Sequence, residues 1–136
     1  MFAKISNYWK FLGRMSSVLK LMKVVDKSPD TLLPDEVEAT VDLHRDRLAI
    51  LFEGQSLTFG EFDARANRVA NWAIAQGYQP GDTVAVVMEN NADYVPIWIG
   101  LSKAGVVAAL INSNLEGTGL AHCVNIVDAK AVIASG

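Results

Sequence analysis

The stretch Thr83-Val84-Ala85-Val86-Val87-Met88 is an almost uninterrupted apolar run, and it decides the class of fold. Runs of this kind are typical of parallel strands that are covered on both faces of a sheet. Two further apolar runs follow it, at residues 106–111 and 130–134. Segments 93–104 and 118–128 separate the three runs and have the length and end signals of helices. This alternation predicts right-handed crossovers and a mostly parallel sheet, that is, an α/β fold.

Shorter elements are expected on the N-terminal side of this run. Residues 48–53 predict a buried strand, residues 54–55 a two-residue turn, and residues 56–58 a short returning strand. A short helix is expected before them, at about residues 34–44. A solvated acidic face explains the carboxylates of this helix without any acid–base role, namely Glu36, Glu38 and Asp42.

A long helix is expected between the hairpin and the first parallel strand. Thr58 and Glu61 have the spacing of a capping box at its start, and Gly77 stands where a left-handed C-terminal cap is needed, after about Gln76. On the outer face, Glu61 and Arg65 are one turn apart and are expected to pair. The buried stripe of this helix is predicted to contain Phe59, Phe62, Ala66, Val69 and Ala73.

The composition places the chain among globular proteins. It has 136 residues, of which 51% are hydrophobic and 20% charged, so a wholly disordered or rod-like chain is excluded. Its single cysteine excludes an internal disulfide, and one cysteine with two histidines cannot form a zinc site without carboxylates. The sequence has no run of eighteen apolar residues, so it predicts no helix that spans a bilayer.

Charge divides the chain at about residue 27. Residues 1–27 carry six basic side chains and one acidic one, whereas the remainder carries six basic and fourteen acidic ones. Apolar residues of this leader recur at steps of three or four and predict one stripe of an amphipathic helix: Ile5, Tyr8, Leu12, Met15, Leu19 and Met22. We therefore expect a basic leader helix at 1–27, a linker at 28–33 and one α/β body at 34–136.

The leader helix allows two interpretations. It can lie in an anionic membrane surface, or it can pack against its own body or a partner domain. In the first case, the membrane-facing residues are Tyr8, Trp9, Leu12, Met15 and Leu19, with Lys10 and Arg14. A nucleic-acid partner is not expected, because the basic residues are few and the acidic body would repel phosphate groups.

Common catalytic signatures are absent from the sequence. It contains no Gly-Lys-Ser/Thr phosphate loop, no Gly-x-Ser-x-Gly elbow and no His-Glu-x-x-His zinc helix. Segment 117–122 is close to a dinucleotide fingerprint, but His122 stands where a third glycine is needed. A loop and a helix that is capped by Thr118 explain this segment better than a phosphate site does.

The best functional candidate is the polar cluster Asn112-Ser113-Asn114. It follows a predicted parallel strand, at the sheet edge where open α/β sheets bind ligands. The alternative is a turn that the asparagine side chains stabilise. His122 could bind a polar partner in a neighbouring loop, and Cys123 is best explained as a small buried thiol.

Three stretches carry a resemblance to a known family. They are Asp46-Arg47-Leu48 through Gly60-Glu61-Phe62, then Asn67-Arg68-Val69-Ala70-Asn71 through Pro80-Gly81-Asp82, and Trp98-Ile99-Gly100-Leu101-Ser102-Lys103-Ala104-Gly105 through Leu115. Together they resemble the opening of the AMP-forming acyl-CoA synthetases, the adenylate-forming superfamily. The segment Ile111-Asn112-Ser113-Asn114-Leu115-Glu116-Gly117, with Leu120, His122 and Cys123, is similar to the fatty acid transport protein branch, the very-long-chain acyl-CoA synthetases.

This resemblance covers about residues 34–136 and implies a two-step ligase. ATP and a fatty acid give an acyl-adenylate and pyrophosphate, and CoA then displaces AMP; Mg²⁺ would offset phosphate charge in the first step. A basic amphipathic leader suits an enzyme whose substrate partitions into membranes, so a cytoplasmic, peripheral membrane location is implied.

The resemblance assigns no catalytic, cofactor-binding or metal-binding residue to this chain. The family's phosphate loop, its adenine- and ribose-binding motifs and the lysine of its small C-terminal domain all lie beyond the matched part. We therefore expect an incomplete front part of the large N-terminal domain, which binds no cofactor and is inactive alone. The alternative is a free-standing, non-catalytic α/β module that binds a membrane or a partner through residues 2–25 and an uncovered sheet edge.

Overall fold

The computed structural model describes Met15 and residues 31–135, and the chain divides into two compact units, Met1–Leu32 and Leu33–Gly136. In the first unit, Met15 is helical and its side chain is exposed. The other leader residues for which a membrane-facing position is predicted lie outside the described residues: Tyr8, Trp9, Lys10, Leu12, Arg14 and Leu19. The leader at 1–27 and the linker at 28–33 therefore stay predictions.

The second unit contains a three-stranded parallel sheet. Its strands are β3 (Thr83–Val87), β4 (Val107–Ile111) and β5 (Ala131–Ala134), in the order β4-β3-β5. Val84, Val86 and their neighbour Ala85 are fully buried, because the central strand is covered on both faces. The predicted α/β class and the parallel sheet are confirmed.

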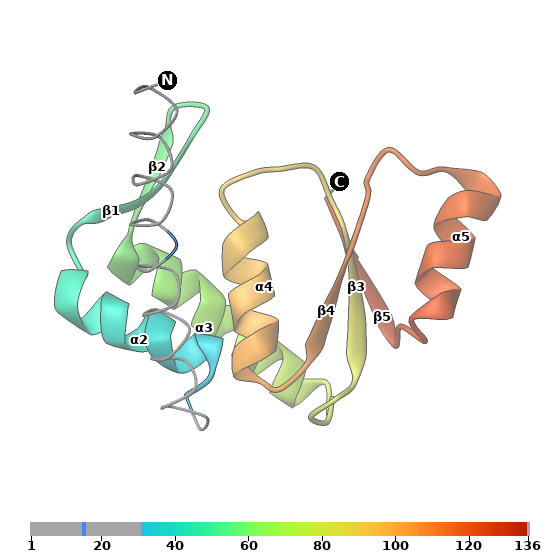
Figure 1. The fold of residues 1–136 in the computed structure, drawn as a ribbon, viewed down its shortest axis with the longest axis horizontal. Helices are drawn as coiled ribbons and strands as arrows, with labels where there is room; N and C mark the ends of the chain where they lie inside the picture. Colours follow the sequence, from blue (N-terminus) through green and yellow to red (C-terminus); the bar gives the residue numbers. More distant parts are fainter. Residues whose placement is uncertain (1–14, 16–30, 136) are drawn as a thin grey trace, which may run out of the picture. The chain divides into compact units, whose positions relative to one another are not determined.

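Three helices cover this sheet. Helices α3 (Phe59–Ala75) and α4 (Tyr94–Lys103) lie on one side of it, and α5 (Gly117–Ile126) lies on the other (Figure 1). This arrangement follows from the right-handed connections, because the chain passes from β3 outward to β4 and then back across β3 to β5. The carboxyl ends of all three strands consequently lie at one edge of the sheet.

The β1–β2 hairpin differs in two details from the sequence prediction. Strands β1 (Leu48–Phe52) and β2 (Gln55–Thr58) pair antiparallel, but the turn residues are Glu53 and Gly54, both with positive φ. The predicted turn at 54–55 is therefore one residue late. The predicted burial of β1 is also wrong, because Leu51 is 69% exposed. The hairpin forms a separate two-stranded sheet, and β1 packs against the protein through Ala49 and Ile50, which are only partly buried.

The start of α3 is fixed as the sequence predicts. The amide of Glu61 donates to the Thr58 hydroxyl, and the amide of Thr58 donates to the Glu61 carboxylate at 2.8 Å. The hydrogen bonds that the amide and the hydroxyl of Thr58 donate to the Glu61 carboxylate lower the pKa of Glu61. The helix ends at Ala75, with Gln76 as its C-cap, and Gly77 has the expected left-handed φ of 81°.

The other helices agree with prediction in extent but not in every cap. The acidic helix α2 spans Leu33–His44 and buries Val41. Helix α4 begins after its N-cap Asp93, which leaves Pro96 in the first turn, where its missing N–H costs nothing. Thr118 is not the cap of α5: the helix already begins at Gly117, and Glu116 occupies the N-cap position without a side-chain hydrogen bond.

Helices α3 and α4 approach very closely at Gly100. A Cβ placed on this glycine would come against the carbonyl oxygen of Ala66 and lie 2.6 Å from Cβ of Val69. The main core continues from this crossing to the sheet, and its buried members are Ala73, Val84, Val86, Met88, Leu101 and Val106. Helix α3 also packs through Phe62 and Ala66 against Ile99 of α4.

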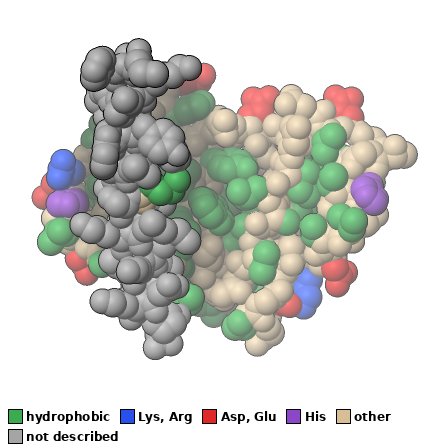
Figure 2. All heavy atoms as spheres, viewed as in Figure 1, with side chains coloured by type: hydrophobic (Ala, Val, Ile, Leu, Met, Phe, Trp, Pro, Cys, Tyr) green, Lys and Arg blue, Asp and Glu red, His purple; other side chains and the backbone are tan. Residues whose placement is uncertain are grey.

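The α5 side of the sheet is much less covered. No residue of α5 is buried, and the side chains of Ile126, Val132 and Val107 are 50% or more exposed. Figure 2 shows hydrophobic side chains at the surface over α4 and between the three-stranded sheet and α5. The buried core of this unit therefore lies mainly between the sheet and helices α3 and α4.

Candidate functional site

A groove lies at the carboxyl edge of the sheet, beside the ends of β3 and β5. We call it the carboxyl-edge groove; its volume is about 530 Å³, and its walls come from α3, the β3–α4 connection, the start of α4 and the end of β5. The residues that line it are Arg65, Arg68, Val69, Trp72, Met88, Asn91, Asp93, Pro96, Ile97, Ile133, Ala134 and Ser135. Open α/β sheets bind their ligands at this edge.

The polar groups of the groove are unequally engaged. Nη1 of Arg65 donates to Oδ1 of Asp93 at 2.6 Å, and Oδ1 of Asn91 accepts the Asp93 amide at 2.8 Å. The expected pair of Arg65 with Glu61 is therefore replaced by a pair with Asp93, which comes from another element. Within the described part of the chain, the guanidinium of Arg68 has no hydrogen bond and no ion pair, and it is exposed.

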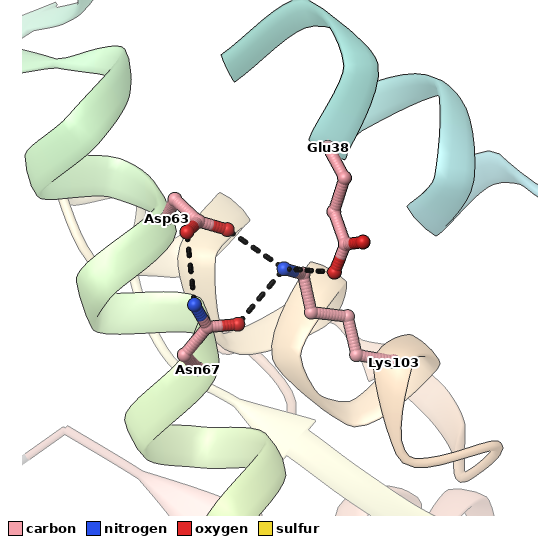
Figure 3. Close-up of polar contacts among 4 residues, drawn as sticks. All are labelled: Glu38, Asp63, Asn67 and Lys103. Carbon is pink, nitrogen blue, oxygen red and sulfur yellow. Dashed lines mark hydrogen bonds and ion pairs between the residues drawn. The ribbon is translucent and has the colours of Figure 1, made fainter. Parts of the chain in front are cut away.

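A lysine whose side chain is mostly buried joins three helices of this unit. Nζ of Lys103, at the end of α4, lies 2.7 Å from a carboxylate oxygen of Asp63, 2.7 Å from one of Glu38 and 2.8 Å from Oδ1 of Asn67. Figure 3 shows these groups converging on the ammonium from α2 and α3. The lysine side chain is only 7% exposed, and its three donors match the three acceptors that protein side chains supply.

The charge of this lysine is stabilised by its partners. Burial alone lowers the pKa of Lys103, but the hydrogen bonds that its ammonium donates to Asp63 and Glu38 outweigh this effect and raise the pKa above its ordinary value. Asn67 also donates to Asp63, which orients that carboxylate. The solvated acidic face predicted for Glu38 is therefore only partly right, because its carboxylate binds Lys103.

The predicted cluster Asn112-Ser113-Asn114 lies directly after β4, at the same edge of the sheet as the groove. Oδ1 of Asn112 accepts the Asn114 amide at 2.9 Å and its side-chain amide at 3.1 Å. The amide of Leu115 donates to the Asn112 carbonyl at 3.2 Å. These bonds are those of a turn that asparagine stabilises, the alternative that the sequence left open; a role beside a substrate stays a prediction.

His122 makes no hydrogen bond or ion pair with Asn112, Ser113 or Asn114. Its side chain is exposed on α5 and has no hydrogen bond or ion pair among the residues that are described. The neighbouring Cys123 is half-buried rather than buried, because α5 covers the sheet only loosely. In the described residues, no group of three His, Cys, Asp or Glu side chains is arranged to hold a metal ion.

Four residues of the site are not predicted from the sequence as functional: Asp63, Asn67, Arg68 and Lys103. Asp63 and Asn67 are four residues apart on one helix, which is a visible signal for neighbouring side chains. Their lysine partner, however, is 40 residues from Asp63 in the chain, and local spacing cannot predict such a contact.

The comparisons with known proteins place this chain in a family. The model of the AMP-binding enzyme family matches residues 37–136, and the chain belongs to this family. The match begins within α2 and includes the whole sheet, the groove and the buried lysine.

Its curated relatives include fatty acid transport proteins and a ligase. The chain is 42% identical over 106 residues to long-chain fatty acid transport protein 1 of Bos taurus, which covers 76% of the chain and 16% of the relative. It is 36% identical over 89 residues to the medium/long-chain-fatty-acid–CoA ligase FadD6 of Mycobacterium tuberculosis, with 65% and 15% covered. The chain thus spans less than a fifth of the length of these relatives.

Solved structures support the same fold. The N-terminal subdomain of Klebsiella oxytoca NpsA, in complex with 3-hydroxyanthranilyl-AMSN, superposes with a TM-score of 0.72 at 22% identity, covering 76% of this chain and 27% of that one. The nonribosomal peptide synthetase FmoA3 gives a TM-score of 0.75 at 26% identity, covering 78% and 11%. The chain therefore has the fold found in the N-terminal part of adenylation domains.

Proposed function

We propose that this chain forms the front part of a long-chain fatty acyl-CoA ligase. Such an enzyme activates a fatty acid with ATP to an acyl-adenylate and pyrophosphate, and then transfers the acyl group to CoA with release of AMP. The observation that carries the proposal is the 42% identity to a long-chain fatty acid transport protein, together with the 36% identity to a fatty acid–CoA ligase.

In this proposal, the chain is a scaffold and supplies no reacting group. Its parallel sheet and the helices α2, α3 and α4, which Lys103 joins, hold the carboxyl edge in place. No residue among 1–136 is assigned to catalysis, to CoA or to Mg²⁺, because the family's phosphate loop, its nucleotide-binding motifs and the lysine of its small C-terminal domain lie beyond the part that the resemblance matches. We propose that the 136 residues alone do not adenylate a fatty acid.

The test uses two proteins, the 136-residue chain and a chimera in which the segment of this chain that aligns with FadD6 over 89 residues replaces the corresponding segment of FadD6. We expect fatty-acid-dependent release of pyrophosphate and formation of acyl-CoA from the chimera, and neither from the chain alone. Measurable turnover by the chain alone would contradict its role as a scaffold. A chimera that is folded by circular dichroism but forms no acyl-CoA would contradict the proposed function.

The leader supports a second proposal, a peripheral location at the cytoplasmic face of a membrane. Its basic residues and its predicted apolar stripe match a helix that lies in an anionic surface. Among the described residues, no helix has the length and apolar character needed to cross a membrane. The alternative, that the leader packs against protein, predicts no affinity for lipid.

Vesicle binding distinguishes these alternatives for the leader. We expect the chain to sediment with vesicles that contain phosphatidylserine but not with neutral vesicles, and to be released as salt rises from about 0.1 to 1 M, because the Debye length then falls from about 10 to 3 Å. Replacing Lys10 and Arg14 by Gln should weaken this binding, whereas replacing Arg45 and Arg47 by Gln should leave it unchanged. Equal effects of the two changes would contradict a specific role of the leader.

A further inference from the structure

We propose that the carboxyl-edge groove binds a long-chain carboxylate, with the carboxylate on Arg68 and the alkyl chain along the apolar wall. This inference rests on the proposed function for the kind of ligand, and it assigns the ligand a site on this chain. The groove faces the edge of a parallel sheet where ligands of open α/β folds bind.

The size and lining of the groove fit an alkyl chain. Its volume of about 530 Å³ lies in the range of about 300–1,000 Å³ that is usual for small-molecule sites. Most of its side chains are apolar, and they come from four separate elements: Val69, Trp72, Met88, Pro96, Ile97 and Ile133. An unbranched alkyl chain can follow such a wall, and it buries apolar surface of its own there.

The charges of the groove fit one anionic head group. Three charged side chains line it, and two of them, Arg65 and Asp93, neutralise each other at 2.6 Å. Arg68 remains, with no partner in the described residues, and lies on the same face of α3 as Val69 and Trp72 at the groove. A guanidinium binds a carboxylate through two parallel hydrogen bonds, so the free arginine selects a carboxylate over an uncharged head group.

The asparagine at this site is already engaged and does not compete for the ligand. Oδ1 of the Asn91 side chain accepts the Asp93 amide, and the side-chain amide nitrogen of Asn91 donates to the Glu89 backbone carbonyl at 3.2 Å. Asn91 therefore holds the main chain of Asp93 in place, and the Asp93 carboxylate binds Arg65. These contacts leave the Arg68 guanidinium as the lining group that is free to bind an anion.

The experiment measures binding of hexadecanoate to the 136-residue chain by equilibrium dialysis, at concentrations below those at which the fatty acid forms micelles. Hexadecanol is the probe without charge. Arg68→Gln removes the proposed anchor, and Arg47→Gln is the matched control, because Arg47 is also exposed but does not line the groove. Thermal unfolding of both variants checks that they remain folded.

We expect saturable binding of hexadecanoate that Arg68→Gln weakens about ten-fold or more, as is typical when a charge-assisted hydrogen bond is lost, and that Arg47→Gln leaves unchanged. Quenching of fluorescence that disappears in Trp72→Phe would support binding at this groove. Equal weakening by the two arginine variants, equally tight binding of hexadecanol, or no saturable binding would each overturn the inference.

The outcome is separable from that of the proposed function. A chimera that forms acyl-CoA, with a chain that does not bind hexadecanoate, would remove the groove site and leave the ligase proposal intact. Arg68-dependent binding with an inactive folded chimera would support the groove site and remove the ligase proposal.

Discussion

Replacing Lys103 by Met is expected to lower the free energy of unfolding by about 2 kcal/mol, between the cost of breaking an exposed ion pair and that of removing one partner from a fully buried one. The change leaves Asp63, whose side chain is 17% exposed, with a carboxylate that has lost its cation. It also removes the ammonium that donates a hydrogen bond to Oδ1 of Asn67, and the ion pair with Glu38 that joins α4 to α2. Guanidinium chloride unfolding of the chain at pH 7 measures the loss.

The pH of this experiment matters because of the sign of the pKa shift. The pKa of Lys103 in the folded chain lies above its ordinary value of 10.5. The stabilisation from its charge is therefore fully present at any pH below 10.5, and it is lost as the pH rises through the folded-state pKa. At pH 7 the whole contribution is therefore present. At a pH well above 10.5, the wild-type chain and Lys103→Met should become more similar in stability.

Glu38→Gln provides the matched control for this cluster. Glu38 binds the same ammonium at 2.7 Å, but its side chain is 58% exposed, so solvent screens the pair and its loss should cost less than about 1 kcal/mol. Replacing Asp63 by Leu together with Lys103→Met removes the orphaned charge and should recover part of the stability. A loss for Lys103→Met no greater than that for Glu38→Gln would contradict the buried role of this lysine.

Local signals in the sequence were sufficient for most of the architecture. The capping box of Thr58 and Glu61, the left-handed cap at Gly77 and the apolar run at 83–88 each depend on residues that are close together in the chain. Such features were predicted within one or two residues. Their alternation was enough to predict the parallel sheet, because the handedness of the crossover connections is fixed by general sterics.

The errors arose where tertiary contacts compete with local ones. Arg65 has a local partner in Glu61, yet it binds Asp93 from the β3–α4 connection, where the ion pair also lines a groove. The apolar composition of residues 48–52 indicates burial, but their strand belongs to a separate two-stranded sheet. Sequence spacing carries no information on which of two possible neighbours folding brings closer.

In the candidate site, too, local sequence signals predict the position and tertiary contacts decide the residues. The sequence predicts a ligand at the carboxyl edge of the sheet, from the position of the cluster Asn112-Ser113-Asn114 directly after a parallel strand. The residues that line the groove come from segments at 65–72, 88–97 and 133–135, and only the packing of α3 and α4 on the sheet assembles them. The geometry of the groove thus depends on how closely these two helices pack.

That packing leads to the second large effect, which is expected for Gly100→Ala. The new Cβ would meet two atoms of α3, the carbonyl oxygen of Ala66 and Cβ of Val69. The first is a main-chain atom, and the second is bonded directly to the main chain. Neither atom can turn away as the end of a flexible side chain could, so the two helices must separate. We expect a loss of about 3 kcal/mol in the free energy of unfolding, at the upper end for overpacked cores.

Gly119→Ala is the matched control, because it makes the same change in another helix. A Cβ at Gly119 would have only Leu115 Cδ2 within reach, at 3.9 Å, which is ordinary van der Waals contact. Alanine is favoured over glycine inside a helix by about 0.8–1 kcal/mol, so this variant should be as stable as the wild-type chain or slightly more stable. If the two variants unfolded at the same denaturant concentration, α3 and α4 could not pack as closely in solution as Gly100 implies. The walls of the groove would then be further apart, and an alkyl chain between them would lose contacts with both.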